Sequence, residues 1–90
     1  MRQVVRSTAF KKDVKRAQKR GKDMERLKAV ILQLLGDEPL PERFKDHPLK
    51  GDWIGYRDLH IEPDWLLLYR LTDDELKLAR TGTHSDLFGE

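Results

Sequence analysis

The sequence predicts an α+β fold with the order β-α-α-β-β-β, in which two N-terminal helices pack on a small antiparallel sheet. Three observations support this prediction. Apolar residues recur at helical spacing in the first 36 residues, strand-like alternation and apolar runs follow from Ile54, and short turns join the last three strands. Ninety residues suffice for one hydrophobic core, so residues 1–90 are expected to form a single domain.

The chain begins with a short predicted strand, Gln3–Val5, followed by a helix. Ser7 or Thr8 can cap this helix, because a side-chain oxygen there accepts a hydrogen bond from a free backbone N–H. Gly21 is expected to end it. Its apolar stripe is narrow and follows the spacing i, i+4, i+7: Phe10, Val14 and Ala17.

A second helix is predicted to start after Asp23, which can cap it, and to stop at Gly36. Pro39 and Pro41 prevent the helix from continuing. Its apolar face is wider than that of the first helix, and it consists of Met24, Leu27, Val30, Ile31, Leu34 and Leu35.

Three strands are predicted in the second half of the chain, at Ile54–Ile61, Trp65–Leu71 and Leu76–Arg80. Residues 72–75 have turn chemistry, and Ser85–Phe88 reads as a short tail. Because the connections are short, these strands are expected to form an antiparallel meander.

Strand alternation also predicts which side chains share a face of the sheet. Asp58 and His60 fall on one face of their strand, and Arg80 falls on the face of Leu76 and Leu78. If the helices cover one face, the histidines are expected on the other face or at its rim.

Positive charge is concentrated in the N-terminal part of the chain. Residues 1–36 hold 11 Lys and Arg against 3 Asp and Glu, whereas residues 37–90 hold 7 against 13. So dense a basic segment indicates binding to nucleic acid or to an acidic protein, and the alternative is an ordinary solvated helix face. The basic residues of the first helix are Lys11, Lys12, Lys15, Arg16, Lys19 and Arg20.

Composition excludes several classes of protein. The chain has no cysteine, which excludes disulfides, a thiol nucleophile and thiolate zinc sites. Its longest apolar runs are too short for a signal peptide or a membrane span. We therefore expect a soluble cytoplasmic protein with no membrane partner.

All three histidines, His47, His60 and His84, lie in the second half of the chain within polar clusters. Histidine both takes and gives a proton near neutral pH. With an arginine and a carboxylate, these residues suffice for metal-free cleavage of RNA, in which the 2′-hydroxyl is the nucleophile. The histidine spacing matches no compact metal motif, so no metal or other cofactor is expected. The alternative from the residues alone is a small module that binds RNA or the ribosome without cutting.

The ordered motifs of the chain resemble the YafQ branch of the RelE-type bacterial toxins. The motifs that carry this resemblance are Lys45–Leu49, Gly51, Trp53, Gly55–Asp58, His60, Glu62–Trp65, Arg80–His84 and Leu87–Gly89. The resemblance implies a microbial-ribonuclease-like fold. It also implies an mRNA interferase, an endoribonuclease that cuts mRNA in the ribosomal A site and so inhibits translation, with in-frame A-A-A lysine codons as the expected target.

The resemblance also implies an active site. His47, His60, Asp64 and His84 would form the acid–base group, with His84 as general acid and either His60 alone or His60 with His47 as the base. Arg80 would stabilise charge on the scissile phosphate. Each of these residues has a structural alternative, since a single histidine in a small domain is more often merely exposed.

Further implied contacts concern the substrate and the partners. Trp65 and Phe88 would shape the site or stack on a base, and the six basic residues of the first helix would bind phosphates of 16S rRNA. A DinJ-like antitoxin would inhibit the toxin, and operator DNA would be bound only through their complex. A ParE-like toxin that binds gyrase is a second alternative, although that branch generally lacks the three histidines.

Overall fold

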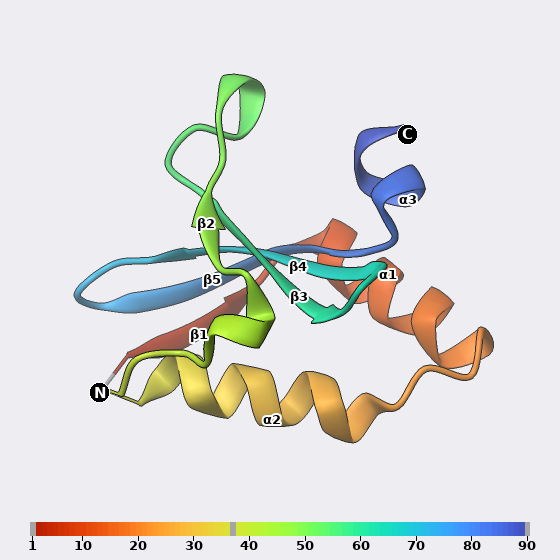
Figure 1. The fold of residues 1–90 in the computed structure, drawn as a ribbon, viewed down its shortest axis with the longest axis horizontal. Coiled ribbons are helices and arrows are strands. Elements are labelled where there is room, and N and C mark those ends of the chain that lie inside the picture. The colour runs from red at the N-terminus through yellow and green to blue at the C-terminus, as the bar shows by residue number, and fades with distance from the viewer. Residues whose placement is uncertain (1, 37, 90) are drawn as a thin grey trace.

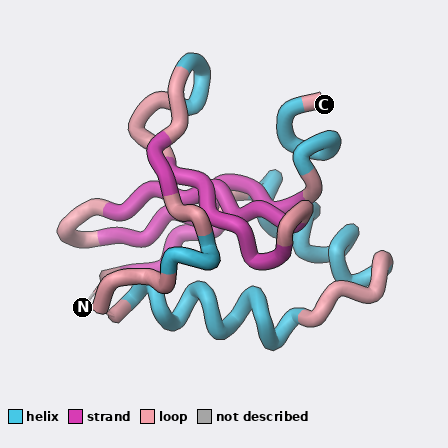
Figure 2. The backbone as a smooth tube through the Cα atoms, in the orientation of Figure 1, coloured by secondary structure: helices cyan, strands magenta, loops and turns pink. Residues whose placement is uncertain are grey.

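The structure, a computed structural model, describes residues 2–36 and 38–89. Figures 1 and 2 show the arrangement of its helices and strands. The elements are β1 (Gln3–Arg6), α1 (Thr8–Lys19), α2 (Met24–Leu35), the 3-10 helix η1 (Glu42–Phe44), β2 (His47–Pro48), the 3-10 helix η2 (Gly51–Trp53), β3 (Arg57–Glu62), β4 (Trp65–Leu71), β5 (Glu75–Gly82) and α3 (His84–Phe88).

The five strands form one sheet in the order β1-β5-β4-β3-β2. The predicted meander of β3, β4 and β5 is confirmed, because each neighbouring pair is antiparallel. β1 instead pairs parallel with β5, from Gln3 opposite Glu75 to Arg6 opposite Leu78, so the sheet is mixed. Nearly the whole chain separates β1 from β5, and alternation within a strand does not encode the direction in which it pairs.

The predicted caps of the two N-terminal helices are confirmed. The Ser7 side chain accepts a hydrogen bond from the backbone N–H of Phe10, and the Asp23 side chain accepts one from Glu25. Gly36 follows the last residue of α2, as expected. With these caps, α1 begins directly after β1, and only four residues separate the end of α1 from the start of α2.

Two parts of the second half differ from the sequence prediction. β3 begins at Arg57 rather than at Ile54, because η2 and a left-handed Gly55 (φ +91°) precede it. Residues Ser85–Phe88, expected to be a tail, belong to α3, which starts with a capping box between Thr83 and Asp86. The two-residue β2 also lies outside every strand that the sequence predicts.

The sheet is covered on both faces. Figure 1 shows α2 along one face, and α3 together with the loop between β2 and β3 on the opposite side. The core on the α2 face joins both helices to the sheet; its buried residues are Phe10, Leu27, Val30, Leu34, Phe44, Leu59, Ile61, Trp65, Leu67, Tyr69, Leu76 and Leu78. Leu66 and Leu68 alternate with these residues along β4 and are also fully buried, on the opposite face.

A β-bulge in β5 changes the side to which Arg80 belongs. Leu78 lies opposite Tyr69, but Arg80 lies opposite Leu68, so Ala79 is the extra residue. Arg80 therefore shares the face of Leu68, not that of Leu78, and the prediction from simple alternation is wrong. One inserted residue thus moves Arg80 to the sheet face that carries His60.

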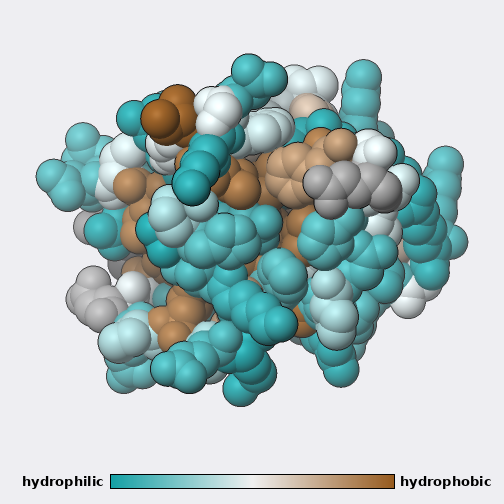
Figure 3. Space-filling view, turned by 45° about the horizontal axis from the view of Figure 1, so that its top comes forward, coloured by the Kyte–Doolittle hydropathy of each residue, from teal (hydrophilic) through white to brown (hydrophobic). Residues whose placement is uncertain are grey.

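The surface in the view of Figure 3 is mostly hydrophilic, with apolar residues in small patches. Within residues 2–36 and 38–89, no helix combines the length and the apolar character that crossing a membrane requires.

A buried hydrogen-bond relay links β4 to β5. Trp65 is 1% exposed, and its indole N–H donates to the Thr81 hydroxyl over 3.0 Å. That hydroxyl in turn donates to the carbonyl of Leu66 over 2.7 Å. Thr81 thus satisfies a polar group that would otherwise be unpaired inside the core.

Thr81→Val should destabilise the protein by about 1–3 kcal/mol, because the buried indole N–H then loses its acceptor. Urea unfolding of the variant and the wild type measures this difference. The same substitution made in a Trp65→Phe background should cost much less, because no N–H is left unpaired. Equal costs in the two backgrounds would contradict the relay.

Candidate active site

The three histidines converge on the sheet face opposite α2. His60 projects from β3, His47 lies on the neighbouring β2, and His84 is the first residue of α3. The ring centroids of His47 and His60 lie 6.4 Å apart, and those of His60 and His84 lie 5.6 Å apart. Despite this proximity, the described residues include no group of three or more His, Cys, Asp or Glu suited to hold a metal ion.

His47 is oriented by the backbone of Lys45. Its Nδ1 lies 2.7 Å from the Lys45 carbonyl, and a carbonyl can only accept, so Nδ1 must carry the proton. Lys45 adopts a left-handed conformation (φ +49°), which turns the chain between η1 and β2. In neutral His47 the free Nε2 is therefore the ring's acceptor, and it lies 3.7 Å from Asp58 Oδ2.

The segment that carries His47 is anchored through Asp46. Its carboxylate accepts a 2.5 Å hydrogen bond from the Tyr69 hydroxyl and further bonds from the Arg57 guanidinium. Burial, and then the hydrogen bond to Asp46, raise the pKa of Tyr69, so the phenol stays protonated as the donor. β4 thereby fixes the position from which β2 starts.

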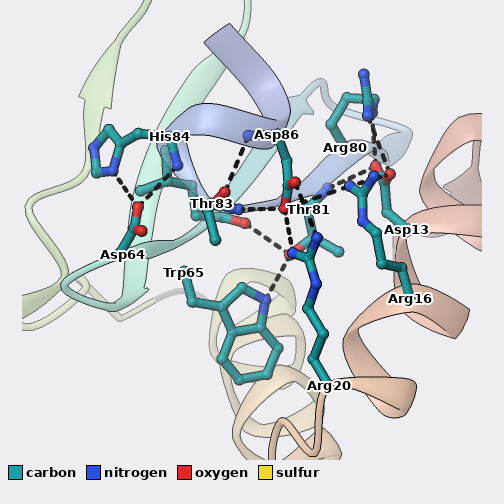
Figure 4. Close-up of polar contacts among 11 residues, drawn as sticks. Asp13, Arg16, Arg20, Asp64, Trp65, Arg80, Thr81, Thr83, His84 and Asp86 are labelled. Atoms are coloured by element: carbon teal, nitrogen blue, oxygen red, sulfur yellow. Dashed lines mark hydrogen bonds and ion pairs between the residues drawn. The ribbon is translucent and has the colours of Figure 1, made fainter. Parts of the chain in front are cut away.

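His84 is held by Asp64. One oxygen of Asp64 accepts from both the backbone N–H of His84, over 2.8 Å, and its Nδ1, over 2.6 Å (Figure 4). The backbone hydrogen bond, followed by the bond from the ring, lowers the pKa of Asp64, so the carboxylate is ionised. An ionised carboxylate against Nδ1 fixes the tautomer, stabilises an imidazolium and leaves Nε2 to meet a substrate.

Asp58 is a member of the site that the sequence analysis did not select. It is 4% exposed and lies between two histidines, with Oδ2 3.7 Å from His47 Nε2 and Oδ1 3.8 Å from His60 Nε2. Oδ1 is buried and has no hydrogen-bond partner among the described residues. The sequence could have pointed to Asp58, because strand alternation places it on the same face as His60. A carboxylate that is buried next to a histidine needs a polar or charged partner.

Burial separates the protonation behaviour of these neighbouring groups. Desolvation raises the pKa of Asp58, although the nearby histidines oppose this shift. Desolvation also lowers the pKa of His60, although Asp58 opposes that shift. The neutral imidazole of His60 is the form that accepts a proton. The ionised carboxylate of Asp64, in contrast, stabilises the protonated form of His84.

Arg80 shares the face of the histidines, but its guanidinium is bound to α1. Its Nε and Nη2 donate to Asp13 over 2.6 and 3.1 Å. In Figure 4 this pair lies on the opposite side of Thr81 from His84 and Asp64. Side-chain hydrogen bonding to Asp13 raises the pKa of Arg80. Among the residues that the structure describes, only Nη1 of this guanidinium is left without a hydrogen-bond partner.

The two predicted aromatic contacts have different outcomes. Trp65 is 1% exposed and packs in the core on the α2 face, so of the two roles expected for it, stacking on a base does not fit the structure and shaping the site stays a prediction. It supports the site only indirectly, through Thr81. Phe88 lies on α3 and is half-buried, so part of its ring is available to a ligand.

The basic residues of α1 fall into two groups. Lys11, Lys12, Lys15 and Lys19 are exposed, and they form no ion pair within the described chain. Arg16 and Arg20 instead pair with Asp86 of α3. The prediction that the six residues bind phosphate stays a prediction, and the charges of these two arginines are already paired within the protein.

A hollow of about 660 Å³ adjoins His60, but neither His47 nor His84 lines it. It lies between α2, η1 and the end of β3, and His60 belongs to its wall. Its other walls combine basic and apolar side chains, among them Arg26, Val30, Arg43, Phe44 and Lys45. A ligand larger than one phosphate group therefore has room beside His60.

Asp58→Asn should be more stable than the wild type near neutral pH, by on the order of 1 kcal/mol, because it removes a buried charge. Because burial raises the pKa of Asp58, protonation of this carboxyl favours the folded state. This stabilisation is complete below the unfolded-state pKa, about 3.9, and it is lost as the pH rises through the folded-state pKa. Urea unfolding should thus show a stability difference that widens as the pH rises from about 4 through the folded-state pKa. Asp52→Asn, at an exposed position in η2, is the control. A difference that narrows with rising pH would contradict this account.

Comparison with known proteins agrees with the fold and shows the family. The family model "Bacterial toxin of type II toxin-antitoxin system, YafQ" matches residues 2–89. The mRNA interferase toxin YafQ of Escherichia coli K12 is 55% identical over 89 residues, which cover 98% of this chain and 97% of that protein. The crystal structure of YafQ from E. coli BL21(DE3) has a TM-score of 0.94 at 53% identity, with 99% and 100% of the two chains covered. The toxin in an E. coli DinJ–YafQ complex has a TM-score of 0.92 at 54% identity, with the same coverage. The chain therefore belongs to the YafQ family of bacterial toxins of type II toxin–antitoxin systems.

Proposed function

We propose that this toxin is an mRNA interferase, an endoribonuclease that cuts mRNA in the ribosomal A site and thereby inhibits translation. The observation that carries the proposal is the convergence of three histidines around two carboxylates, one ionised and one buried. The E. coli relative at 55% identity is named an mRNA interferase, which supports the same chemistry for this chain.

The reaction uses the substrate's own 2′-hydroxyl as the nucleophile. His60, neutral because burial lowers its pKa, takes the proton of the 2′-hydroxyl while the 2′-oxygen forms a bond to phosphorus. The bond from phosphorus to the 5′-oxygen then breaks, and Nε2 of a protonated His84 gives that oxygen a proton. The products are a 2′,3′-cyclic phosphate and a free 5′-hydroxyl, so atoms and protons balance.

The other polar residues support these two steps. Asp64 stabilises the imidazolium of His84 by accepting the hydrogen bond from its Nδ1. Asp58 lies 3.8 Å from Nε2 of His60 and stabilises the charge that His60 acquires, and His47 lies on the other side of Asp58. The free Nη1 of Arg80, which Asp13 holds in place, meets negative charge that develops on the phosphate.

We also propose a DinJ-like antitoxin as the partner, with operator DNA bound through the complex of the two proteins. A solved structure titled as a DinJ–YafQ complex contains a toxin with 54% identity to this chain. The exposed lysines of α1 suit both phosphates of 16S rRNA and an acidic antitoxin segment. In-frame A-A-A lysine codons are the proposed target, on the strength of family membership.

In a reconstituted translation system, the wild type should cut an mRNA that carries in-frame A-A-A codons, and it should need ribosomes to do so. His84→Ala should slow cleavage by about 10²–10⁴-fold, because the leaving oxygen then lacks its proton donor. Asp52→Asn serves as the folded control, and mapping of the RNA 5′-ends measures the cut.

Two outcomes would contradict the proposal in different ways. Translation arrest with intact mRNA would indicate a module that binds the ribosome without cutting. Inhibition of gyrase with no effect on translation would indicate a ParE-like toxin. Full cleavage by His84→Ala would leave the ribonuclease proposal in place but remove His84 as general acid.

Ribosome binding by the wild type should weaken as salt concentration rises, because phosphate contacts release bound counterions. Each of Lys11→Gln, Lys12→Gln, Lys15→Gln and Lys19→Gln should weaken binding and lower the slope of log affinity against log salt by roughly 1. Sedimentation with ribosomes at several salt concentrations measures this slope. An unchanged slope in all four variants would show that α1 does not face the rRNA.

A further inference from the structure

The helix that carries His84 cannot fix its own position. α3 has five residues, none of them buried, and it bears both His84 and Phe88. So short a helix is marginal by itself, since its nucleation is unfavourable and its few hydrogen bonds add little. The position of the His84 imidazole must therefore come from contacts between α3 and the rest of the protein.

Asp86 provides the contact between α3 and α1. Its carboxylate accepts hydrogen bonds from both terminal nitrogens of Arg20, over 2.6 and 3.3 Å, and Arg16 approaches to 3.6 Å (Figure 4). The same carboxylate accepts the backbone N–H of Thr83 over 3.0 Å, which closes the capping box of α3. One side chain thus starts the helix and attaches it to a second element.

The surroundings of Asp86 strengthen this attachment. The Asp86 side chain is only 13% exposed and that of Arg20 is 46% exposed, so water reaches the ion pair mainly from the arginine side. Hydrogen bonding from Arg20, and then from the Thr83 backbone, holds the pKa of Asp86 well below its usual value. The carboxylate is therefore ionised across the pH range in which histidines titrate.

Gly82 leaves the space in which the attachment forms. A Cβ at this position would lie 3.0 Å from both Cβ and Oδ2 of Asp86, and 3.2 Å from Nη2 of Arg16. A side chain there would therefore crowd the Asp86 carboxylate and the Arg16 guanidinium. The glycine at the end of β5 therefore has a packing role that turn formation alone does not explain.

We propose that Asp86, held by Arg20, is a positioning residue that fixes α3 and with it the imidazole of His84. The proposal rests on the function proposed above, because it concerns the geometry of the proposed general acid. Arg20, which the sequence suggested as a phosphate-binding residue, then acts on catalysis through Asp86 and not through rRNA.

Amide hydrogen exchange in the free protein tests the attachment without any assay of cleavage. In Arg20→Gln and Asp86→Asn, the Leu87 and Gly89 amides, which bond to Thr83 and Ser85 carbonyls, should exchange about tenfold faster. Amides of β5 should be unaffected, which shows that the variants are folded. Arg70→Gln, which removes an exposed arginine from β4, is the matched control and should change neither set.

Cleavage kinetics test the consequence for His84. Arg20→Gln should lower kcat about tenfold with little change in KM, and it should add almost nothing in an Asp86→Asn background, since residues that act together are not additive. Arg20→Lys, which keeps the charge, should recover part of kcat. Additive losses in the double variant would overturn the proposal. A raised KM with unchanged kcat and unchanged amide exchange would also overturn it, and it would make Arg20 a direct ribosome contact. If the wild type does not cut RNA, the proposed function fails, while the exchange experiment still decides the attachment.

Discussion

The architecture depends on the burial of β4 on both of its faces. The residues from Trp65 to Tyr69 are all 0–2% exposed, and each fully buried leucine contributes about 1.5–3 kcal/mol. A strand buried on both faces requires a cover on each side. α2 supplies the apolar cover on one side. On the other side, the layer above Leu66 and Leu68 comes from short elements that carry the polar site, so the histidines also shield part of the hydrophobic core.

Within that layer, the environment assigns different protonation states to chemically similar groups. Asp64 is exposed and hydrogen-bonded, so its pKa falls, whereas Asp58 is buried without enough donors, so its pKa rises. Burial lowers the pKa of His60 in the same layer. Groups whose pKa values are pushed apart in this way can act as acid and base at one pH. The buried charge of Asp58 costs stability, and the site retains it where a neutral side chain would pack more favourably.

Much of this arrangement follows from the sequence because it depends on local patterns. The helix caps, the apolar faces of α1 and α2 and the meander are each encoded within a few neighbouring residues. Simple alternation puts Arg80 on the wrong face because a bulge inserts one residue, and only the partner strand reveals that insertion. The burial of Trp65 cannot be predicted from the sequence, because an aromatic residue next to a functional motif looks the same in sequence whether its ring points in or out. The pairing of Arg20 with Asp86 joins residues 66 positions apart, and no local pattern indicates it.

The parallel pairing of β1 with β5 has a consequence for synthesis of the chain. β5 is the last of the five strands to be made, yet it lies between β1 and β4 in the finished sheet. A nascent chain that ends before Glu75 has nothing against which β1 can pair, and it also lacks Arg80 and His84. The complete sheet can therefore form only after β5 has been synthesised, so the strand order makes pairing of the first strand wait for the last one.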